Sequence, residues 1–193
     1  MIIGFTGFCC SGKDTVAEYI SNKYGYVHYS LSDIIRKIMI DFNIDINDRK
    51  NVISFGIELR KKNGNDVLAK KVLEKITAIN KCCVTSIRHP SEVIKLKKRD
   101  DFILVNIDSP IFLRFERMKN RGRPGDPLTF EKFIEFETME LHKDGPGQQL
   151  KRTADMADIN FTNDSNSVVI LYDAIEKLFV KIYNFFELNN KKL

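Results

Sequence analysis

A glycine-rich loop near the N-terminus constrains the fold of this chain more than any other feature. Residues 7–15 read Gly-Phe-Cys-Cys-Ser-Gly-Lys-Asp-Thr and follow a short apolar run, residues 1–6, that predicts a buried parallel strand. In residues 15–24 apolar side chains then recur at helical spacing. Strand, glycine loop, lysine and helix form the context that the phosphate-binding pattern G-x-x-x-x-G-K-[ST] requires. The sequence therefore predicts nucleotide binding.

The parts of this loop have separate roles in holding phosphate. Successive backbone N–H groups form an anion nest, and the positive end of the following helix points at the same place. The lysine reaches the β- and γ-phosphates as a mobile point charge, so we assign it a catalytic role as well. The residues that we expect to bind ATP here are Gly7, Cys10, Ser11, Gly12, Lys13, Asp14 and Thr15.

Asp14 departs from the pattern, because it occupies the place of the Ser or Thr that normally touches magnesium. A carboxylate is a stronger ligand for a hard cation than a hydroxyl. We therefore interpret Asp14 as a Mg²⁺-site residue, binding directly or through water. The alternative is an acidic residue at a helix N-terminus, where the helix dipole favours it. The sequence leaves both interpretations open.

Composition indicates a soluble globular protein with an anionic partner. The 193 residues are 43% hydrophobic and 30% charged, which suits one domain with a real core. No apolar run approaches the ~18 residues that span a bilayer, and a strand beginning at Ile2 leaves no room for a signal peptide. We expect a cytoplasmic protein with no membrane partner.

The net charge of +5 comes without a DNA or RNA recognition motif, which favours a small-molecule nucleotide over nucleic acid. The oligomeric state is left open.

The four cysteines form two adjacent pairs, Cys9-Cys10 and Cys82-Cys83, and neither pair has the spacing of a metal site. In a doubly wound sheet the first pair would lie past the carboxyl end of the first strand. The second pair would open a later strand at the opposite edge. We therefore expect free thiols in a reducing compartment and no disulfide between the pairs.

Strands and helices alternate along the chain, which predicts a parallel sheet covered on both faces. Further strands are expected at residues 27–30, 82–87, 102–107 and 159–162. Helices are expected at residues 33–42, 49–62, 66–79, 90–98, 110–120 and 168–188. Glycines and prolines break the pattern at residues 121–127, and a polar, partly helical insert follows to about residue 156.

Charged side chains follow the second predicted strand at the edge where open parallel sheets bind ligands. Asp33 and Arg36 are three residues apart and share one face at the start of a helix. The aspartate could orient or deprotonate an acceptor hydroxyl, and the arginine could grip a phosphate bidentately. A helix-start aspartate that stabilises the dipole and pairs with Arg36 has the same spacing. The sequence supports both interpretations equally.

The loop after the third predicted strand carries Arg88 at the same edge. His89 beside it is expected to be a capping or solvent-facing histidine and not a catalyst. Thr85 and Ser86 stand where many phosphate-loop enzymes carry a metal-positioning aspartate. Because no aspartate stands at the end of this strand, Asp14 becomes the main candidate for positioning Mg²⁺.

The densest basic cluster contains Arg114, Arg117, Arg121 and Arg123. The three- and four-residue spacing of the first three places them on one helical face. Glycines and prolines at residues 122–127 would allow the end of that face to move. A cationic, hinged segment suits a lid that closes over transferring phosphates and excludes water. The alternative is a solvated basic face. Beside a phosphate loop we favour the lid.

These stretches resemble the nucleoside monophosphate kinase group of P-loop proteins over nearly the whole chain. Residues 30–36, Ser-Leu-Ser-Asp-Ile-Ile-Arg, look like the S-T-G-D-M-L-R segment of adenylate kinases and the D-A-D-x-I-A-R segment of dephospho-coenzyme A kinases. Other stretches resemble archaeal P-loop kinases and the P-loop region joined to some deoxycytidylate deaminases: residues 55–60, 87–93, 147–149 and 157–158. The Gly-Lys-Asp-Thr loop is shared with phage deoxynucleotide kinases. No H-x-E and P-C-x-x-C zinc pattern is present, so deaminase chemistry is excluded.

The resemblance implies an α/β fold of the P-loop NTPase type, with three αβα layers, a five-stranded parallel sheet of order 2-3-1-4-5 and a helical lid. It implies one domain, residues 1–193, with an acceptor-binding insert near 36–80 and a lid near 121–152. ATP and Mg²⁺ are the implied cofactors. The residues that it assigns to acceptor binding are Asp33, Arg36, Arg60 and Arg88. Those that it assigns to catalysis are Lys13, Asp33, Arg117 and Arg121, and Asn163 is placed against adenine.

Two classes of function follow. The first is an ATP-dependent kinase for a nucleoside or deoxynucleoside monophosphate, with dephospho-coenzyme A as the second acceptor. The other is a slow regulatory ATPase whose output is a contact with a partner. Three arginines on the acceptor side favour the enzyme, because a nucleotide sensor needs no second phosphate pocket. The base and the sugar of the acceptor are left open.

Overall fold

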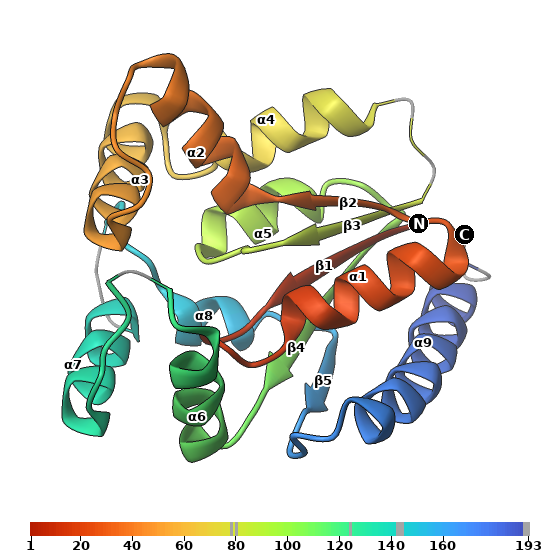
Figure 1. Cartoon of the computed structure of the whole chain (residues 1–193). Coiled ribbons are helices and arrows are strands. Elements are labelled where there is room, and N and C mark those ends of the chain that lie inside the picture. The colour runs from red at the N-terminus through yellow and green to blue at the C-terminus, as the bar shows by residue number, and fades with distance from the viewer. Residues whose placement is uncertain (78, 80, 124, 142–144, 191–193) are drawn as a thin grey trace.

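A five-stranded parallel sheet forms the centre of the protein in the computed structural model, which describes residues 1–77, 79, 81–123, 125–141 and 145–190. The strands lie in the order β2-β3-β1-β4-β5, as the sequence predicted (Figure 1). Their bounds are β1 (Ile2–Thr6), β2 (Val27–Ser30), β3 (Cys82–Thr85), β4 (Phe102–Asp108) and β5 (Ile159–Thr162). All four pairings are parallel.

Helices cover both faces of this sheet and extend beyond its carboxyl edge. One face packs against α1 (Lys13–Tyr24) and α9 (Val168–Asn190). The other packs against α2 (Leu31–Asp41), α4 (Val67–Ile76) and α5 (Pro90–Leu96). The remaining helices are α3 (Arg49–Asn63), α6 (Ile111–Arg121), α7 (Phe130–Leu141) and α8 (Leu150–Ala154). In Figure 1, α2 and α3 lie on one side of the carboxyl edge, and α6 and α7 lie on the other.

The central strands are apolar without alternation because both of their faces are buried. Cys82 and Cys83, adjacent in β3, illustrate this. Cys82 packs into the core under α2 and α4, and Cys83 packs into the core under α1 and α9. Successive side chains of a strand point to opposite faces, so the two thiols cannot meet. All four cysteines are free, as predicted.

The boundaries of several elements differ from those that the sequence predicted. The third strand ends at Thr85 and not at residue 87, because Ser86 adopts a left-handed conformation with φ 62° and turns the chain away. The helix predicted at residues 33–42 begins at Leu31, directly after β2. The helix predicted at 66–79 ends at Ile76, and residue 78 lies outside the described residues.

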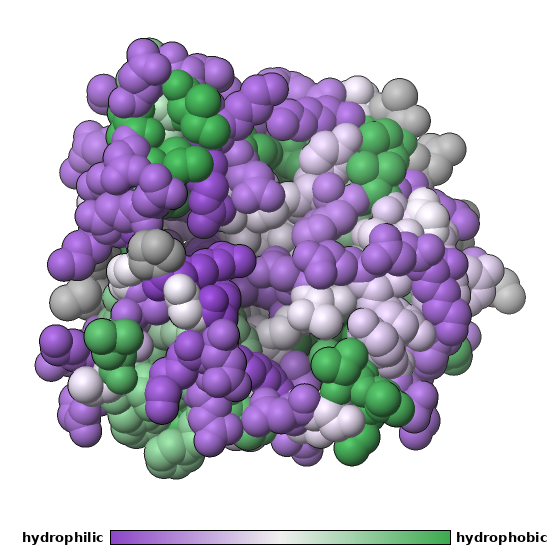
Figure 2. All heavy atoms as spheres, viewed as in Figure 1, coloured by the Kyte–Doolittle hydropathy of each residue, from purple (hydrophilic) through white to green (hydrophobic). Residues whose placement is uncertain are grey.

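Within the described part of the chain, none of the helices combines the length and apolar character that crossing a membrane demands. The longest of these helices, α9, has 23 residues, and Asp173, Glu176, Lys177, Lys181 and Glu187 interrupt its apolar character. Its exposed apolar residues begin with Val168, Val169 and Ile170, close to the end of β5. Figure 2 shows apolar surface in this region, at the lower right of the view.

Candidate functional site

A cavity of about 820 Å³ opens at the carboxyl edge of the sheet. Figure 2 shows mainly hydrophilic side chains around it, between α3 above and α6 and α7 below. The acidic side chains that line the cavity are Asp14, Glu18, Asp33 and Asp126. The cationic ones are Lys13, Arg36, Arg49, Arg60, Arg88, Arg117, Arg121 and Arg123. This excess of positive charge suits a ligand with several negative charges.

The phosphate loop lies at one end of the cavity, and its two glycines are required by close contacts. A Cβ on Gly7, which has φ 136°, would lie 2.1 Å from the carbonyl oxygen of Ile107. A Cβ on Gly12, with φ 95°, would lie 2.4 Å from the side-chain nitrogen of Asn163. Neither position can therefore carry a side chain without movement of the neighbouring loops.

Lys13 begins α1 at the base of the loop and is only 5% exposed. Its Nζ lies 3.4 Å from the carbonyl oxygen of Phe8, so the side chain folds back across the loop. The amide of Val16 donates to Gly12 and starts the helix, whose positive end therefore faces the same space. Lysine, backbone and helix terminus converge where the sequence predicted a phosphate site.

Asp14 and Thr15 line the cavity beside Lys13, and the Asp14 side chain is exposed. In proteins Mg²⁺ keeps several waters and binds through one or two carboxylates together with substrate phosphates. One exposed carboxylate next to a hydroxyl fits that chemistry. Among the described residues no group of three or more His, Cys, Asp or Glu could hold a metal without help from a ligand.

Asn163 and Arg117 fasten the phosphate loop to the loop after β5. Asn163 is buried, and its Nδ2 donates to the carbonyl oxygen of Ser11 at 2.9 Å. Arg117 donates to the carbonyl oxygen of Cys10 at 3.3 Å and to that of Ser165 at 2.7 Å. Both side chains contact the loop from beneath, and the guanidinium of Arg117 also lines the cavity.

A second group of charges surrounds Cys9 in the same loop. Arg121 donates to both carboxylate oxygens of Asp126 at 2.8 Å and faces the Cys9 sulfur at 3.8 Å and 3.9 Å. Arg49, at the start of α3, reaches the same sulfur at 3.2 Å and lies 3.8 Å from Asp126. The cluster therefore joins the phosphate loop, α3 and the segment after α6.

The two thiols of the loop differ in acidity. The pKa of Cys9 lies well below its usual value, chiefly because Cys10 hydrogen-bonds to its sulfur at 3.7 Å. Burial opposes this shift, and the charges of Arg49, Lys13 and Arg121 support it. The pKa of Cys10 is raised by the same hydrogen bond and by burial. The two shifts favour a negative charge on Cys9 and a proton on Cys10.

Alkylation should separate the two pairs of cysteines. Burial raises the pKa of Cys82 and of Cys83 to about 12, and neither side chain is exposed. At neutral pH we expect iodoacetamide to label the Cys9-Cys10 pair through the Cys9 sulfur in the folded protein, and to leave residues 82 and 83 unmodified, since the thiolate is the reactive form. ATP should slow the labelling, because the loop lies under the phosphates. Mass spectrometry of tryptic peptides measures this, and equal labelling with and without ATP would contradict the placement.

Asp33 and Arg36 lie at the other end of the cavity, on the first turns of α2. Arg36 donates to Asp33 at 3.1 Å and to the Ser32 hydroxyl at 2.9 Å. The Asp33 side chain is 73% exposed, so this pair is open to solvent and contributes little to stability. Hydroxyls of Ser30 and Ser86 lie 3.1 Å apart on the wall beside it.

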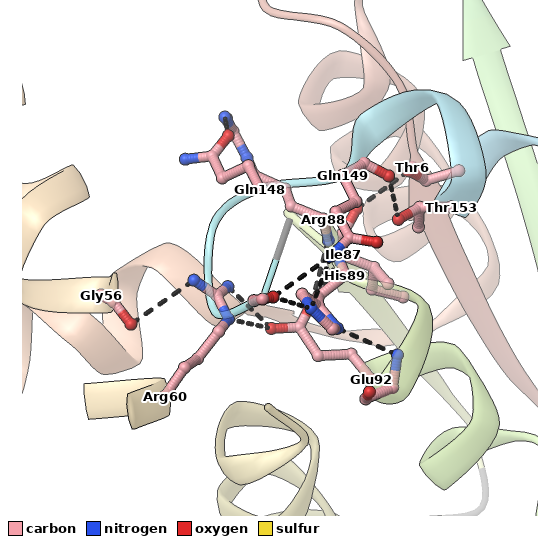
Figure 3. A network of polar contacts seen from close by, with 12 residues as sticks. Thr6, Gly56, Arg60, Ile87, Arg88, His89, Glu92, Gln148, Gln149 and Thr153 are labelled. Atoms are coloured by element: carbon pink, nitrogen blue, oxygen red, sulfur yellow. Dashed lines mark hydrogen bonds and ion pairs between the residues drawn. The ribbon is translucent and has the colours of Figure 1, made fainter. Parts of the chain in front are cut away.

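Arg60 lines the cavity, but a carboxylate already engages its guanidinium (Figure 3). Glu92 Oε1 accepts from Arg60 Nη2 at 2.8 Å and from Nε at 3.2 Å, and both side chains are buried. Glu92 Oε2 accepts from the backbone amides of Arg88 and His89. His89 caps α5, with its Nδ1 accepting from the amide of Ser91, so the capping role that the sequence indicated is confirmed.

Arg88 reaches across the cavity rim to the insert that precedes α8. Its Nη1 donates to Gln148 Oε1 at 2.8 Å, and its carbonyl oxygen accepts from the amide of Gln149 at 2.9 Å. The side chain of Thr153 donates to the carbonyl oxygen of Gln149 in turn (Figure 3). Residues 148–152, the end of the predicted lid, are thus tied to the loop after β3. Residues 124 and 142–144 of that lid lie outside the described residues.

The predicted arginine face of α6 divides into two parts. Arg117 and Arg121 face the cavity, whereas Arg114 is buried and pairs with Glu137 of α7. The rings of Phe8 and Phe133 lie against the Arg114 guanidinium at 4.7 Å and 5.8 Å. Arg114 therefore fixes α7 to α6 and does not join the cavity. The alternative of a solvated basic face is wrong for Arg114, which is buried, whereas Arg117 and Arg121 are half-buried and line the open cavity.

Comparison with known proteins places the chain in a family. The sequence pattern of a family described as an AAA domain matches residues 6–130. A UPF0200 protein of Thermococcus kodakarensis is 32% identical over 148 residues, which cover 73% of this chain and 79% of the relative. The chain belongs to the UPF0200 family. A UPF0200/UPF0201 protein of Archaeoglobus fulgidus is 32% identical over 183 residues, which cover 92% of the chain but only 53% of that relative. The UPF0200 chain thus spans about half the length of the Archaeoglobus protein.

Solved structures show that this UPF0200 chain has the fold of P-loop kinases. The crystal structure of a shikimate kinase from Bacteroides thetaiotaomicron superposes with a TM-score of 0.61 at 12% identity, covering 95% of this chain and 98% of the kinase. At 12% identity the superposition shows a shared fold and nothing more. The predicted fold class and the resemblance to P-loop kinases are confirmed.

Three residues of the UPF0200 site were not singled out from the sequence: Arg49, Glu92 and Asp126. Arg49 meets Cys9 and Asp126 only through tertiary packing, so no local spacing indicates this cluster. Glu92 belongs to residues 87–93, a stretch that resembles archaeal P-loop kinases. The one local signal for its role is its position three residues after His89, where the acidic residue of a capping box stands.

Proposed function

We propose that the protein is an ATP-dependent phosphotransferase that moves the γ-phosphate to a nucleoside or deoxynucleoside monophosphate. The observation that carries the proposal is the cavity itself, with the phosphate loop at one end and the arginines Arg36 and Arg88 at the other. Two separate cationic ends suit two phosphate-bearing substrates whose reacting groups meet between them.

The residues at the loop end would hold ATP. Lys13 would neutralise charge on the β- and γ-phosphates, and Asp14 would hold Mg²⁺ directly or through water, supplying the charge neutralisation that phosphoryl transfer needs. Arg117 and Arg121 would stabilise the transferring group. Asn163 supports the loop from below, and we propose that its loop also borders the adenine.

At the opposite end, Arg36 and Arg88 would grip the acceptor phosphate. Arg60 would add charge to this end in spite of its pairing with Glu92, because it lines the same cavity. The lid that we expect near residues 121–152 would close over the two substrates. Use of ATP agrees with a cytoplasmic location.

Dephospho-coenzyme A is the second candidate acceptor. It presents a ribose hydroxyl, which needs a base, and the exposed carboxylate of Asp33 could supply one. A slow regulatory ATPase is favoured by one observation, that Thr85 and Ser86 stand at the end of β3 in place of a carboxylate. The acceptor-side arginines support the kinase.

A panel of acceptors assayed with ATP and magnesium tests the proposed function. It contains ribo- and deoxyribonucleoside monophosphates of each base, dephospho-coenzyme A, and shikimate, which is the substrate named for a protein of the same fold. ADP formation that depends on one monophosphate supports the proposal. ADP formation at the same slow rate whether or not an acceptor is present would indicate the regulatory ATPase.

Two variants at the acceptor end should tell the candidate acceptors apart. For a monophosphate, Arg36→Ala should raise the acceptor KM at least tenfold with little change in ATP binding, because a charge-assisted contact is lost. Asp33→Asn should lower kcat only mildly, since a phosphate nucleophile needs no deprotonation. Steady-state kinetics with each substrate varied measures both. A loss of several orders of magnitude in kcat for Asp33→Asn, with the acceptor KM of Arg36→Ala unchanged, would require the monophosphate to be abandoned.

A further inference from the structure

Two adjacent cysteines lie inside the phosphate loop, and none of the roles described above uses their sulfur atoms. The Cys9 and Cys10 sulfurs are 3.7 Å apart, and both side chains line the cavity. Cys10 adopts a left-handed conformation with φ 59°. This turn brings two successive side chains to the same side, which a strand would not allow.

The surroundings of Cys9 favour the anionic sulfur. Arg49 lies 3.2 Å from it and Arg121 lies 3.8 Å from it. The guanidinium groups stay positive at any physiological pH, so they stabilise a thiolate. The charged groups around the sulfur are Arg49 from α3, Arg121 and Asp126 from α6 and the segment after it, and Lys13 from α1.

Cys10 supplies the second thiol for an exchange reaction. It is more exposed than Cys9 and keeps its proton, since the adjacent thiolate raises the pKa of Cys10. When the Cys9 charge is removed by oxidation, the part of that shift caused by Cys9 disappears, and burial alone still raises the pKa of Cys10. Cys10 then ionises more readily and becomes a nucleophile next to an oxidised sulfur.

We propose that Cys9 and Cys10 form a peroxide-sensitive pair whose disulfide closes the phosphate loop to nucleotide. The Cys9 thiolate attacks hydrogen peroxide, the O–O bond breaks, and Cys9 sulfenic acid and hydroxide form, with the sulfur oxidised by two electrons. The Cys10 sulfur then attacks the sulfenic sulfur, a Cys9–Cys10 disulfide forms, and water leaves. A dithiol returns both residues to the reduced state. This inference rests on the nucleotide binding in the proposed function.

Closure of the disulfide opposes nucleotide binding through the backbone of the loop. It fixes the backbone of residues 9 and 10 in a small ring, whereas ATP requires the amides of this loop to point at its phosphates. Adjacent Cα atoms are ~3.8 Å apart, below the 4.4–6.8 Å usual for disulfides, so the bond is strained and easily reduced. A labile bond suits regulation.

The protein contains a matched control pair at Cys82 and Cys83. The two sequences are both Cys-Cys, but these thiols lie on opposite faces of β3, are fully buried, and have pKa values raised to about 12. Trypsin separates the pairs, since Lys13 ends the first peptide and Lys81 and Arg88 bound the second. One digest therefore reports on both.

The experiment treats the reduced wild-type chain with hydrogen peroxide and follows peptide masses and the Kd of a fluorescent ATP analogue. Peptide 1–13 should lose two hydrogens, about 2 Da, peptide 82–88 should stay unchanged, and the Kd should rise roughly tenfold or more. Dithiothreitol should reverse both changes. In Cys10→Ser, compared with itself before and after treatment, fragment masses of peptide 1–13 should place one added oxygen on Cys9, counted apart from any oxygen on Met1.

The outcomes separate this inference from the proposed function. Oxygen gain on Cys9 or Cys10 without hydrogen loss in the wild type, disulfide-linked dimers, or equal oxidation of peptide 82–88 would overturn the inference. A disulfide that leaves the Kd unchanged would also overturn it, as would an equal rise of the Kd in Cys10→Ser. If the fully reduced chain does not bind the analogue, the proposed function fails, and the peptide masses still decide whether the pair is peroxide-sensitive.

Discussion

Lys13→Ala should reduce phosphoryl transfer by roughly a hundredfold or more and leave a folded protein. The side chain lies across the phosphate loop, where its ammonium is positioned before the substrate arrives. A charge that is already in place costs no reorganisation as negative charge develops in the transition state, so its loss acts mainly on kcat. Steady-state assays with ATP, magnesium and the best acceptor of the panel measure the effect.

Lys177→Ala is the matched control, since Lys177 lies exposed on α9 and does not line the cavity. It should keep the wild-type rate. Circular dichroism of both variants checks that they are folded. Wild-type turnover in Lys13→Ala would remove the kinase proposal altogether, because no other described side chain combines burial in the loop with a cationic end group there.

Glu92→Gln should destabilise the protein by about 3–5 kcal/mol, the usual cost of leaving one member of a buried ion pair alone. Glutamine keeps the size of the side chain and can still accept from a backbone amide. The Arg60 guanidinium, however, would lose the carboxylate that it contacts twice in a fully buried position. Denaturant unfolding measures the change as a shift of the midpoint at constant slope.

Two further variants show whether the loss of stability in Glu92→Gln comes from the burial of the ion pair. Arg60→Met together with Glu92→Gln should recover part of the lost stability, because the unpaired charge is gone. Glu58→Gln breaks an exposed pair with Lys61 on the same helix as Arg60 and should cost less than about 1 kcal/mol. Equal losses for Glu58→Gln and Glu92→Gln would mean that the buried pair does not stabilise the fold.

The sequence was sufficient for the sheet because its signals are local. Each strand is a short apolar run, each helix has its own periodicity, and the loop at residues 7–15 identifies which strand is β1. The strand order 2-3-1-4-5 came from the resemblance to P-loop kinases. It could not have come from periodicity, since β1 pairs with β3 and β4 through contacts far apart in the chain.

The site was predicted less completely, because charge alone does not say which partner a side chain finds. Arg36, Arg60 and Arg88 line the cavity as expected, but Arg60 also contacts a carboxylate, and Arg114 packs against α7 instead. Spacing on a helix shows which residues share a face. It does not show what packs on that face. Arg60 and Arg114 each pair with a buried glutamate from another helix, Glu92 and Glu137.

The phosphate loop belongs to the first fifteen residues, but its shape depends on chain that is synthesised much later. Asn163 donates to Ser11 across 152 positions, and Gly7 fits against the carbonyl of Ile107. At about 5–20 residues per second, a ribosome needs roughly 8–30 s to reach Asn163 after completing the loop. A nascent chain should therefore acquire nucleotide affinity only after β5 has left the exit tunnel, and fragments that stop before residue 163 should lack it.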